Sequence, residues 1–146
     1  MIEFFEVLTK GAMRLSTPTD QSISDANYVV LEFDEVTMER GGIICDPTAN
    51  TITVSSTGPY SVHIGVDGTF PGAEMLELMV YVNGAAYSPH PLILQGRANQ
   101  KPVSIFWEST VNLDDGDVLD VRGRNGESGT FTLSLQRMYM AVIKEH

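Results

Sequence analysis

Apolar and polar residues alternate along most of the chain after residue 27, and this two-residue period constrains the fold more than any other feature. One apolar series consists of Tyr60, Val62, Ile64 and Val66. Another consists of Phe131, Leu133 and Leu135. Because successive side chains of a strand point to opposite faces, each series predicts a strand with one buried face. Helical periodicity is almost absent, so the sequence predicts an all-β sandwich in which these faces meet.

Glycine-containing turn signals separate the predicted strands. The sharpest lies in "LMVYVNGAAYS", where Asn83 and Gly84 connect two apolar segments. Both residue types tolerate positive φ, so this segment predicts a hairpin with a type I′ turn.

The segment "LDDGDVLDV" carries Asp114, Asp115, Gly116 and Asp117 and invites comparison with a calcium-binding loop. A calcium hand also needs a glutamate at the end of a twelve-residue loop and flanking helices, which this pattern lacks. We therefore interpret Gly116 and Asp117 as a structural turn between two strands. A weak surface cation site is the alternative.

Some predicted strands are apolar on both faces, which a single sandwich cannot bury. A subunit interface explains the second face, and cover by the amino-terminal segment is the alternative. The residues predicted for the interface are Met79, Tyr81, Phe106, Met138, Tyr139 and Met140. The alternation does not indicate which apolar face meets the core and which meets the neighbour.

Residues 1–26 differ from the alternating region, since an apolar beginning is followed by a polar run. They are predicted to form an amino-terminal arm that binds another protein, packs on its own oligomer or is disordered, and residues 27–146 to form the domain. The arm residues predicted to dock on a partner are Phe4, Phe5, Leu8, Lys10, Arg14 and Leu15.

Composition restricts the classes of partner. The net charge of −10 repels phosphate backbones and anionic lipids, so neither nucleic acid nor a membrane is an expected partner. A single cysteine, Cys45, excludes an internal disulfide framework and fits a small packed side chain in a reducing compartment. The beginning "MIEFFE" lacks the pattern of a secretory signal and predicts a protein made in the cytosol.

Residues that could carry chemistry are scattered. His63, His90 and His146 do not stand at ligand spacing from one another or from Cys45. No nucleophile-elbow, phosphate-loop or zinc-protease motif occurs. The sequence therefore predicts neither an enzyme nor a bound cofactor.

The order of several motifs over about residues 27–143 resembles the jelly-roll domains of complement component 1q and tumour necrosis factor. An aromatic opening strand, "YVVLEFDEV", precedes "GGIICDPTANTITV" and "TGPYSVHIGV". The hairpin "LELMVYVNG", the turn "LDDGDVLDV" and the closing strand "TFTLSLQRMYMAVI" follow in the family's order. The resemblance implies a jelly-roll β-sandwich that assembles as a homotrimer through apolar strand faces.

The chain departs from the secreted members of that family because it contains no collagen-like Gly-X-Y repeat. It looks more like the jelly-roll virion proteins of tailed bacteriophages, which are made in the bacterial cytoplasm. The function expected from this resemblance is capsid decoration. A trimeric cement protein of this kind binds the major capsid protein on the outer surface of the phage head and stabilises it. The alternative is a receptor- or glycan-binding tip of a tail fibre or spike, with Tyr87, Phe70 or Trp107 stacking on a sugar.

Overall fold

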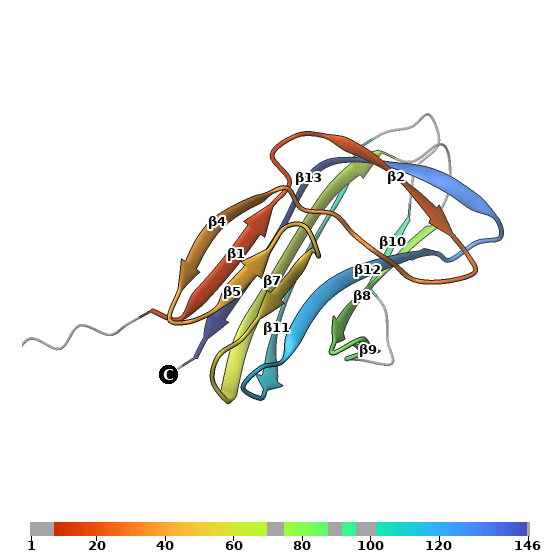
Figure 1. Ribbon diagram of the computed structural model, residues 1–146. Coiled ribbons are helices and arrows are strands. Elements are labelled where there is room, and N and C mark those ends of the chain that lie inside the picture. Colours follow the sequence, from red (N-terminus) through yellow and green to blue (C-terminus); the bar gives the residue numbers. More distant parts are fainter. Residues whose placement is uncertain (1–7, 70–74, 88–91, 96–101, 146) are drawn as a thin grey trace, which may run out of the picture.

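The computed structural model describes residues 8–69, 75–87, 92–95 and 102–145 (Figure 1). Every regular element in these ranges is a strand, which agrees with the predicted all-β class, and no helix that could cross a membrane occurs in them. The strands are β1 (Lys10–Arg14), β2 (Thr19–Ser24), β3 (Val29–Val30), β4 (Glu35–Arg40), β5 (Ile44–Asp46), β6 (Thr51–Thr53), β7 (Gly58–Thr69), β8 (Met75–Val82), β9 (Ala85–Ala86), β10 (Leu92–Gln95), β11 (Pro102–Leu113), β12 (Val118–Asn125) and β13 (Thr130–Lys144).

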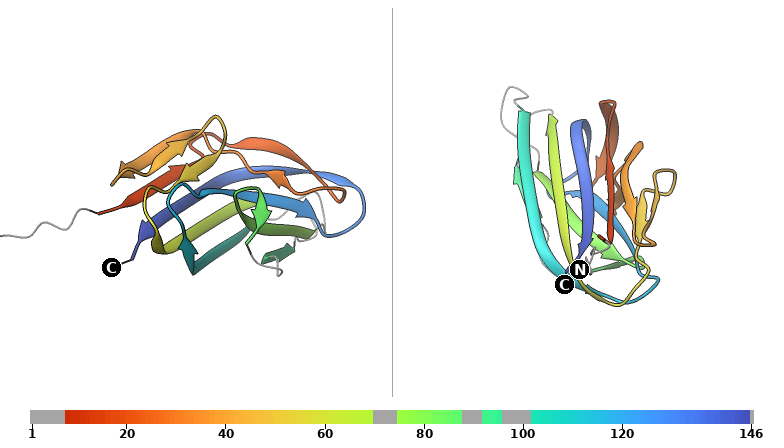
Figure 2. Two further views of the ribbon diagram at one scale, coloured as in Figure 1. Left: turned by 60° about the horizontal axis from the view of Figure 1, so that its bottom comes forward. Right: turned by 90° about the vertical axis from the view of Figure 1, so that its left-hand side faces the viewer.

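These strands form two antiparallel sheets packed face to face. The first, called the β13 sheet below, has the order β11-β7-β13-β1-β4, and β2 also pairs with β13. The second, the β12 sheet, has the order β10-β8-β12-β6-β5, with β3 beside β12 and β9 beside β8. The right-hand view of Figure 2 shows β11, β7, β13 and β1 side by side in one layer, with the other sheet behind them.

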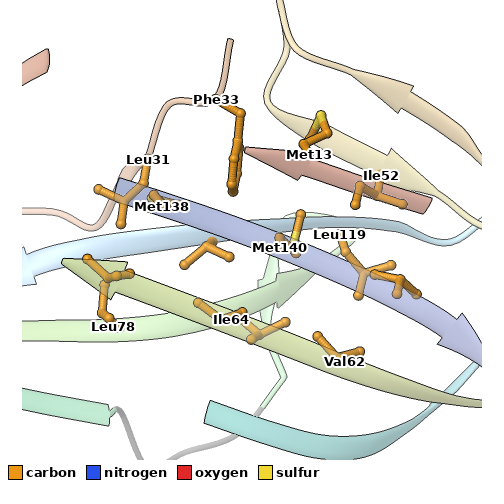
Figure 3. Packing of buried hydrophobic residues seen from close by; sticks show 14 of the residues in the cluster. Met13, Leu31, Phe33, Ile52, Val62, Ile64, Leu78, Leu119, Met138 and Met140 are labelled. Carbon is orange, nitrogen blue, oxygen red and sulfur yellow. The ribbon is translucent and has the colours of Figure 1, made fainter. Parts of the chain in front are cut away.

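Apolar side chains from both sheets fill the space between the layers (Figure 3). Val62, Ile64 and Val66 of β7 are almost completely buried there, as the alternation predicts. Cys45 also belongs to this core. Its burial, with the nearby charge of Glu39, raises the pKa of the thiol to about 11.

Residues 10–24 are built into the β13 sheet, so the predicted arm over residues 1–26 is wrong for this stretch. Strand β1 lies between β13 and β4, and β2 pairs with Thr130–Leu135 of β13. The large apolar side chain in β1 that faces the core is Met13. It stands among the small residues Gly11 and Ala12, so the two-residue period is hard to recognise there.

The residues predicted to dock on a partner therefore lie in different environments. Leu15 is buried in the core and cannot reach another protein. Lys10 and Arg14 lie within β1, and Leu8 is 38% exposed just before it. Phe4 and Phe5 lie outside the described residues.

The two predicted turns have clear local geometry. Asn83 and Gly84 both adopt positive φ, 53° and 79°, as a type I′ hairpin requires. In the aspartate segment Gly116 has a φ of 90°, and the Asp117 amide donates to the Asp114 carbonyl.

The Asp117 carboxylate is engaged within its own turn and with the neighbouring hairpin. It accepts hydrogen bonds from the Asp114 amide and from the Asn83 side-chain nitrogen, each at 2.8 Å. The Asn83 side-chain oxygen in turn accepts from the Val118 amide. This network fastens the two turns together and gives the aspartate a structural role. Among the residues that the structure describes, no three His, Cys, Asp or Glu side chains converge to hold a metal ion.

Candidate interaction surface

The outward side of the β13 sheet carries aromatic and small residues in rows that cross the strands. One row runs from Phe106 of β11 through Gly65 and Tyr139 to Arg14 of β1, because these residues are partners in the strand register. The next row runs through Glu108, His63, Ala141 and Ala12 in the same order. This outward side of the β13 sheet is called the open face below.

Phe106 and Tyr139 are the large exposed residues of the open face. Their exposed fractions are 60% and 39%, and their ring centroids lie 6.4 Å apart. The centroid of the His63 ring lies 6.2 Å from that of Phe106. Such aromatic clusters on a surface mark a site of interaction more often than isolated exposed apolar residues do.

Gly65 allows the Tyr139 ring to lie flat on the sheet. A Cβ atom at position 65 would approach the Tyr139 Cζ atom to 2.7 Å and would collide with the rest of the ring. Substitution at Gly65 would therefore lift the ring and change the shape of the open face.

Tyr139 lines several hollows, of which two lie mainly over the open face. One has a volume of about 400 Å³, and small side chains stand in it where Ala141 and Ala12 are neighbours across the strands. Lys10, Arg14, Thr37, His63 and Ile143 also line it. The other, of about 550 Å³, lies between Tyr139 and Phe106 and is also lined by Asp67 and Arg137. The open face is therefore uneven, with one depression between the two exposed rings and another beyond Tyr139.

The polar groups of the open face are only partly engaged. The His63 Nε2 atom lies 2.9 Å from the Ser61 hydroxyl, and its Nδ1 atom is 3.7 Å from a Glu108 oxygen. Partial burial raises the pKa of the Tyr139 phenol, and the charges of Asp67 and Glu108 add to this effect. No described residue forms a hydrogen bond with the Tyr139 hydroxyl, which therefore remains free to bond across a contact.

The outward side of the β12 sheet is different because its apolar centre, Met79, is covered. Met79 is 7% exposed although it points away from the core. The side chains gathered on this outward side with Met79 are Tyr28, Glu77, Tyr81, Asp120, Arg122 and Arg124, called the closed cluster below.

Ion pairs and ring contacts hold the closed cluster together. Arg122 forms two hydrogen bonds with Asp120, at 2.7 and 3.1 Å, and stacks over the Tyr81 ring. Arg124 likewise bonds to Glu77 at 2.7 and 3.1 Å and lies over the ring of Tyr28. The Tyr28 hydroxyl is 3.1 Å from Glu77 as well. Partial burial, followed by this hydrogen bond, raises the pKa of the Tyr28 phenol.

The six residues predicted for the subunit interface are distributed over three environments. Phe106 and Tyr139 lie on the open face, and Met79 and Tyr81 belong to the closed cluster. The prediction is wrong for Met138 and Met140, which are buried between the sheets of the same chain (Figure 3). Residues 138 and 140 share a strand face with Val142, and the β13 register directs that face to the core.

The sequence interpretation missed Ala12, Ala141 and Tyr28. The two alanines matter because the register sets them side by side, and no single-strand pattern indicates this pairing. Tyr28 lies far from Met79 along the chain, and only the pairing of β3 with β12 brings it there.

Comparison with solved structures supports the fold strongly. The Eiger TNF of S. frugiperda matches with a TM-score of 0.71 and 15% identity, over 97% of this chain and 94% of the other. Murine APRIL at pH 5.0 matches with a TM-score of 0.66 and 16% identity, over 94% and 99%. The globular domain of the zebrafish complement 1qA protein matches with a TM-score of 0.62 and 12% identity, over 95% and 98%.

These matches confirm the expected jelly-roll β-sandwich of the tumour necrosis factor and complement 1q type. No protein-family model matches the sequence, and no curated protein matches it significantly. At identities of 12% to 16%, the likeness concerns the fold.

Proposed function

We propose that the protein is a structural protein that assembles as a homotrimer through the open face of the β13 sheet. The observation that carries this proposal is the exposure of Phe106 and Tyr139 on a face with no cover from the described residues. Burying such rings removes apolar surface from water at about 25 cal/mol per Å². We propose three copies because the chain resembles jelly rolls that form trimers.

The proposed role of the trimer is decoration of a bacteriophage head, where it would bind the outer surface and stabilise the major capsid protein lattice. A trimer presents three identical docking surfaces on one rigid body, so weak individual contacts act at high effective concentration. The net charge of −10 favours a protein partner over nucleic acid.

We now propose that the docking segment comprises residues 1–8, because most of the other predicted docking residues have places in the sheet or the core. Arg14 and Lys10 line a hollow of the open face, and Leu15 is in the core. Removal of residues 1–15 would delete β1 from the middle of its sheet and unfold the protein. The informative variant is therefore deletion of residues 1–8, which should abolish capsid binding and leave the trimer folded.

Assembly is tested by measuring the molar mass in solution with light scattering after size-exclusion chromatography. The expected mass is three times the 16.0 kDa of the chain. Phe106→Asp should reduce it to that of one chain, because it places a charge in the contact. Ile44→Asp is the matched control, since Ile44 is also 60% exposed but lies on β5 of the other sheet.

A wild-type protein that is monomeric at micromolar concentration would overturn the homotrimer. A Phe106→Asp variant that remains trimeric would instead overturn the assignment of the contact to the open face. Loss of the trimer in both variants would indicate a general effect of charge rather than a specific face.

Decoration is tested by quantitative mass spectrometry of purified phage particles. The proposal predicts a copy number that is a simple fraction of that of the major capsid protein. A handful of copies in each particle would assign the protein to the tail and favour the receptor-binding tip instead.

A further inference from the structure

A break in the strand pairing of β13 leaves a hollow at the end of β1. Strand β1 pairs with residues 139–143 of β13 and β2 with residues 130–135, so neither strand pairs with residues 136–138. A β-bulge occurs at the same place, because the register between β13 and β7 shifts between Leu135 and Arg137. Bulges redirect side chains and are frequent next to functional sites. The hollow has a volume of about 480 Å³ and is called the bulge hollow below.

The bulge hollow is basic although the chain is acidic. The chain has 19 acidic and 9 basic residues, and two of the basic residues line this hollow. No carboxylate is found among the described residues that line it. Its polar lining consists of Arg14, Ser16, Gln136, Arg137 and Tyr139. This composition fits an anionic ligand.

The donors of the bulge hollow are largely unused by the chain itself. Arg14 binds Glu35 through its Nε atom at 2.9 Å, whereas its two terminal nitrogens form no hydrogen bond with a described residue. The exposed side chains of Arg137 and Gln136 have no partner in the part of the chain that the structure describes. Asp67, the register partner of Arg137, lines a different hollow. Two guanidinium groups and an amide are therefore free to bind a ligand.

Two carboxylates close to the bulge hollow are already engaged. Asp34 accepts hydrogen bonds from the Ser16 amide and hydroxyl at 2.7 and 2.8 Å, and from the Thr17 amide at 3.1 Å. These bonds hold the connection between β1 and β2, which forms one wall of the hollow. Glu35 restrains the guanidinium of Arg14 from its Nε side. The two carboxylates thus support the wall and the cation.

Tyr139 adds a hydroxyl group to the bulge hollow. Partial burial raises the pKa of this phenol, and the charges of Asp67 and Glu108 add to the effect. The hydroxyl therefore keeps its proton at neutral pH and can donate a hydrogen bond to an anion. None of the described residues competes for that hydrogen bond.

We propose that the bulge hollow binds a small organic anion, whose carboxylate or phosphate group is held between Arg14 and Arg137. A guanidinium presents a planar fork of donors that matches either group and binds it through two hydrogen bonds. The volume of the hollow lies within the range of about 300–1,000 Å³ that is typical of small-molecule sites. The site needs only one chain, so this inference goes beyond the proposed assembly.

Isothermal titration calorimetry of the full chain at pH 7 and low ionic strength tests the site, with succinate and inorganic phosphate as separate probes. We expect saturable binding of at least one probe, at one site in each chain, with a dissociation constant of about 1 mM or lower. Because the chain as a whole repels anions, saturable binding would require a local site. Tighter binding of succinate would identify the carboxylate as the recognised group, and tighter binding of phosphate would identify the phosphate. Absence of saturable binding for both probes would overturn the inference.

Arg137→Gln is the test variant, because Arg137 is exposed and its replacement breaks no contact with a described residue. It should raise the dissociation constant at least about tenfold, since it removes charged hydrogen bonds. Arg40→Gln is the matched control. It removes the same charge from an exposed residue of β4 that does not line the hollow, and should change the constant less than about twofold. Thermal melting checks that both variants are folded.

Equal weakening by Arg137→Gln and Arg40→Gln would reveal a general charge effect and would refute the site, as would unchanged binding in Arg137→Gln. The oligomeric state separates this inference from the proposed function. A wild-type trimer that binds neither probe would leave the assembly in place and remove the anion site. A wild-type monomer that binds a probe through Arg137 would remove the assembly and support the site.

Discussion

The outward sides of the two sheets have similar apolar sequence patterns and very different surroundings. On the β12 sheet, Met79 is 7% exposed, and on the same outward side its register partner Arg122 stacks over Tyr81, which in turn contacts Tyr28. On the β13 sheet, Phe106 is 60% exposed and lies beside Tyr139. An apolar residue on the outer face of a strand therefore indicates an interface only when the chain itself provides no cover.

The difference originates in the segment before β3. This segment carries Tyr28 across the β12 sheet, where its ring contacts Tyr81 and Arg124 and its hydroxyl contacts Glu77. Nothing equivalent among the described residues crosses the β13 sheet. Cover by the chain itself thus accounts for the apolar residues on the outward side of the β12 sheet. For those on the open face of the β13 sheet, the proposal is self-association.

The largest expected effect separates the two sides of a single strand. Met140→Ala should lower the free energy of unfolding by about 2–5 kcal/mol, because it opens a cavity between the sheets. Its neighbour Tyr139 points to the open face, so Tyr139→Ala should weaken assembly and cost far less stability. Chemical denaturation measures the first effect and sedimentation the second.

Both measurements need a background in which assembly does not contribute to stability, since binding between folded copies stabilises them. Phe106→Asp provides that monomeric background. If Tyr139→Ala destabilises the monomer as much as Met140→Ala, the open face is part of the folding core and the contrast between the faces is lost.

A smaller effect tests whether the closed cluster is self-sufficient. Glu77→Gln removes the charge that binds Arg124 and Tyr28 and should cost about 1 kcal/mol of stability, since charged hydrogen bonds contribute somewhat more than neutral ones but Arg124 is partly exposed. It should not change the oligomeric state. Chemical denaturation in the Phe106→Asp background measures the free energy of unfolding of Glu77→Gln and compares it with that of Glu108→Gln.

Glu108 serves as the control because, among the described residues, its carboxylate has only the 3.7 Å approach to His63. Its replacement should alter monomer stability by less than about 0.5 kcal/mol. A loss of assembly in Glu77→Gln would show that the closed cluster also takes part in the contact between copies.

The sequence predicted the all-β class, the core face of β7 and the two turns because these depend on residues close together in the chain. The residue types of Asn83 and Gly84 are enough to predict a turn, and the alternation that includes Val62 and Ile64 is enough to predict a buried strand face. The side of the sheet to which Met140 points could not be predicted in this way. Both faces of its strand are apolar, and only the partner sheet determines which of them is buried.

The arm was misjudged for a related reason. Strand β1 has a weak period of its own, and its place in the sheet comes from hydrogen bonds to β13, at the far end of the chain. The open face has the same origin, because its rows combine β11, β7, β13 and β1. Long-range register, rather than local preference, creates the candidate site.

The smallest expected effect concerns Tyr28 of the closed cluster and Tyr139 of the open face. In the monomeric background at pH 8, Tyr28→Phe should cost about 0.5–1 kcal/mol, because it removes the hydrogen bond to Glu77, whereas Tyr139→Phe removes no hydrogen bond and should cost almost nothing. Burial and the bond to Glu77 raise the pKa of Tyr28 above its ordinary value of 10.0, so folding favours the protonated phenol. This contribution is complete below that ordinary pKa and is lost as pH rises through the folded pKa. The stability difference between wild type and Tyr28→Phe should therefore shrink between pH 8 and pH values above that range, as urea denaturation at each pH would measure. A difference that grows with pH would mean that the ionised phenol is the favoured form, with Arg124 rather than burial dominating the closed cluster.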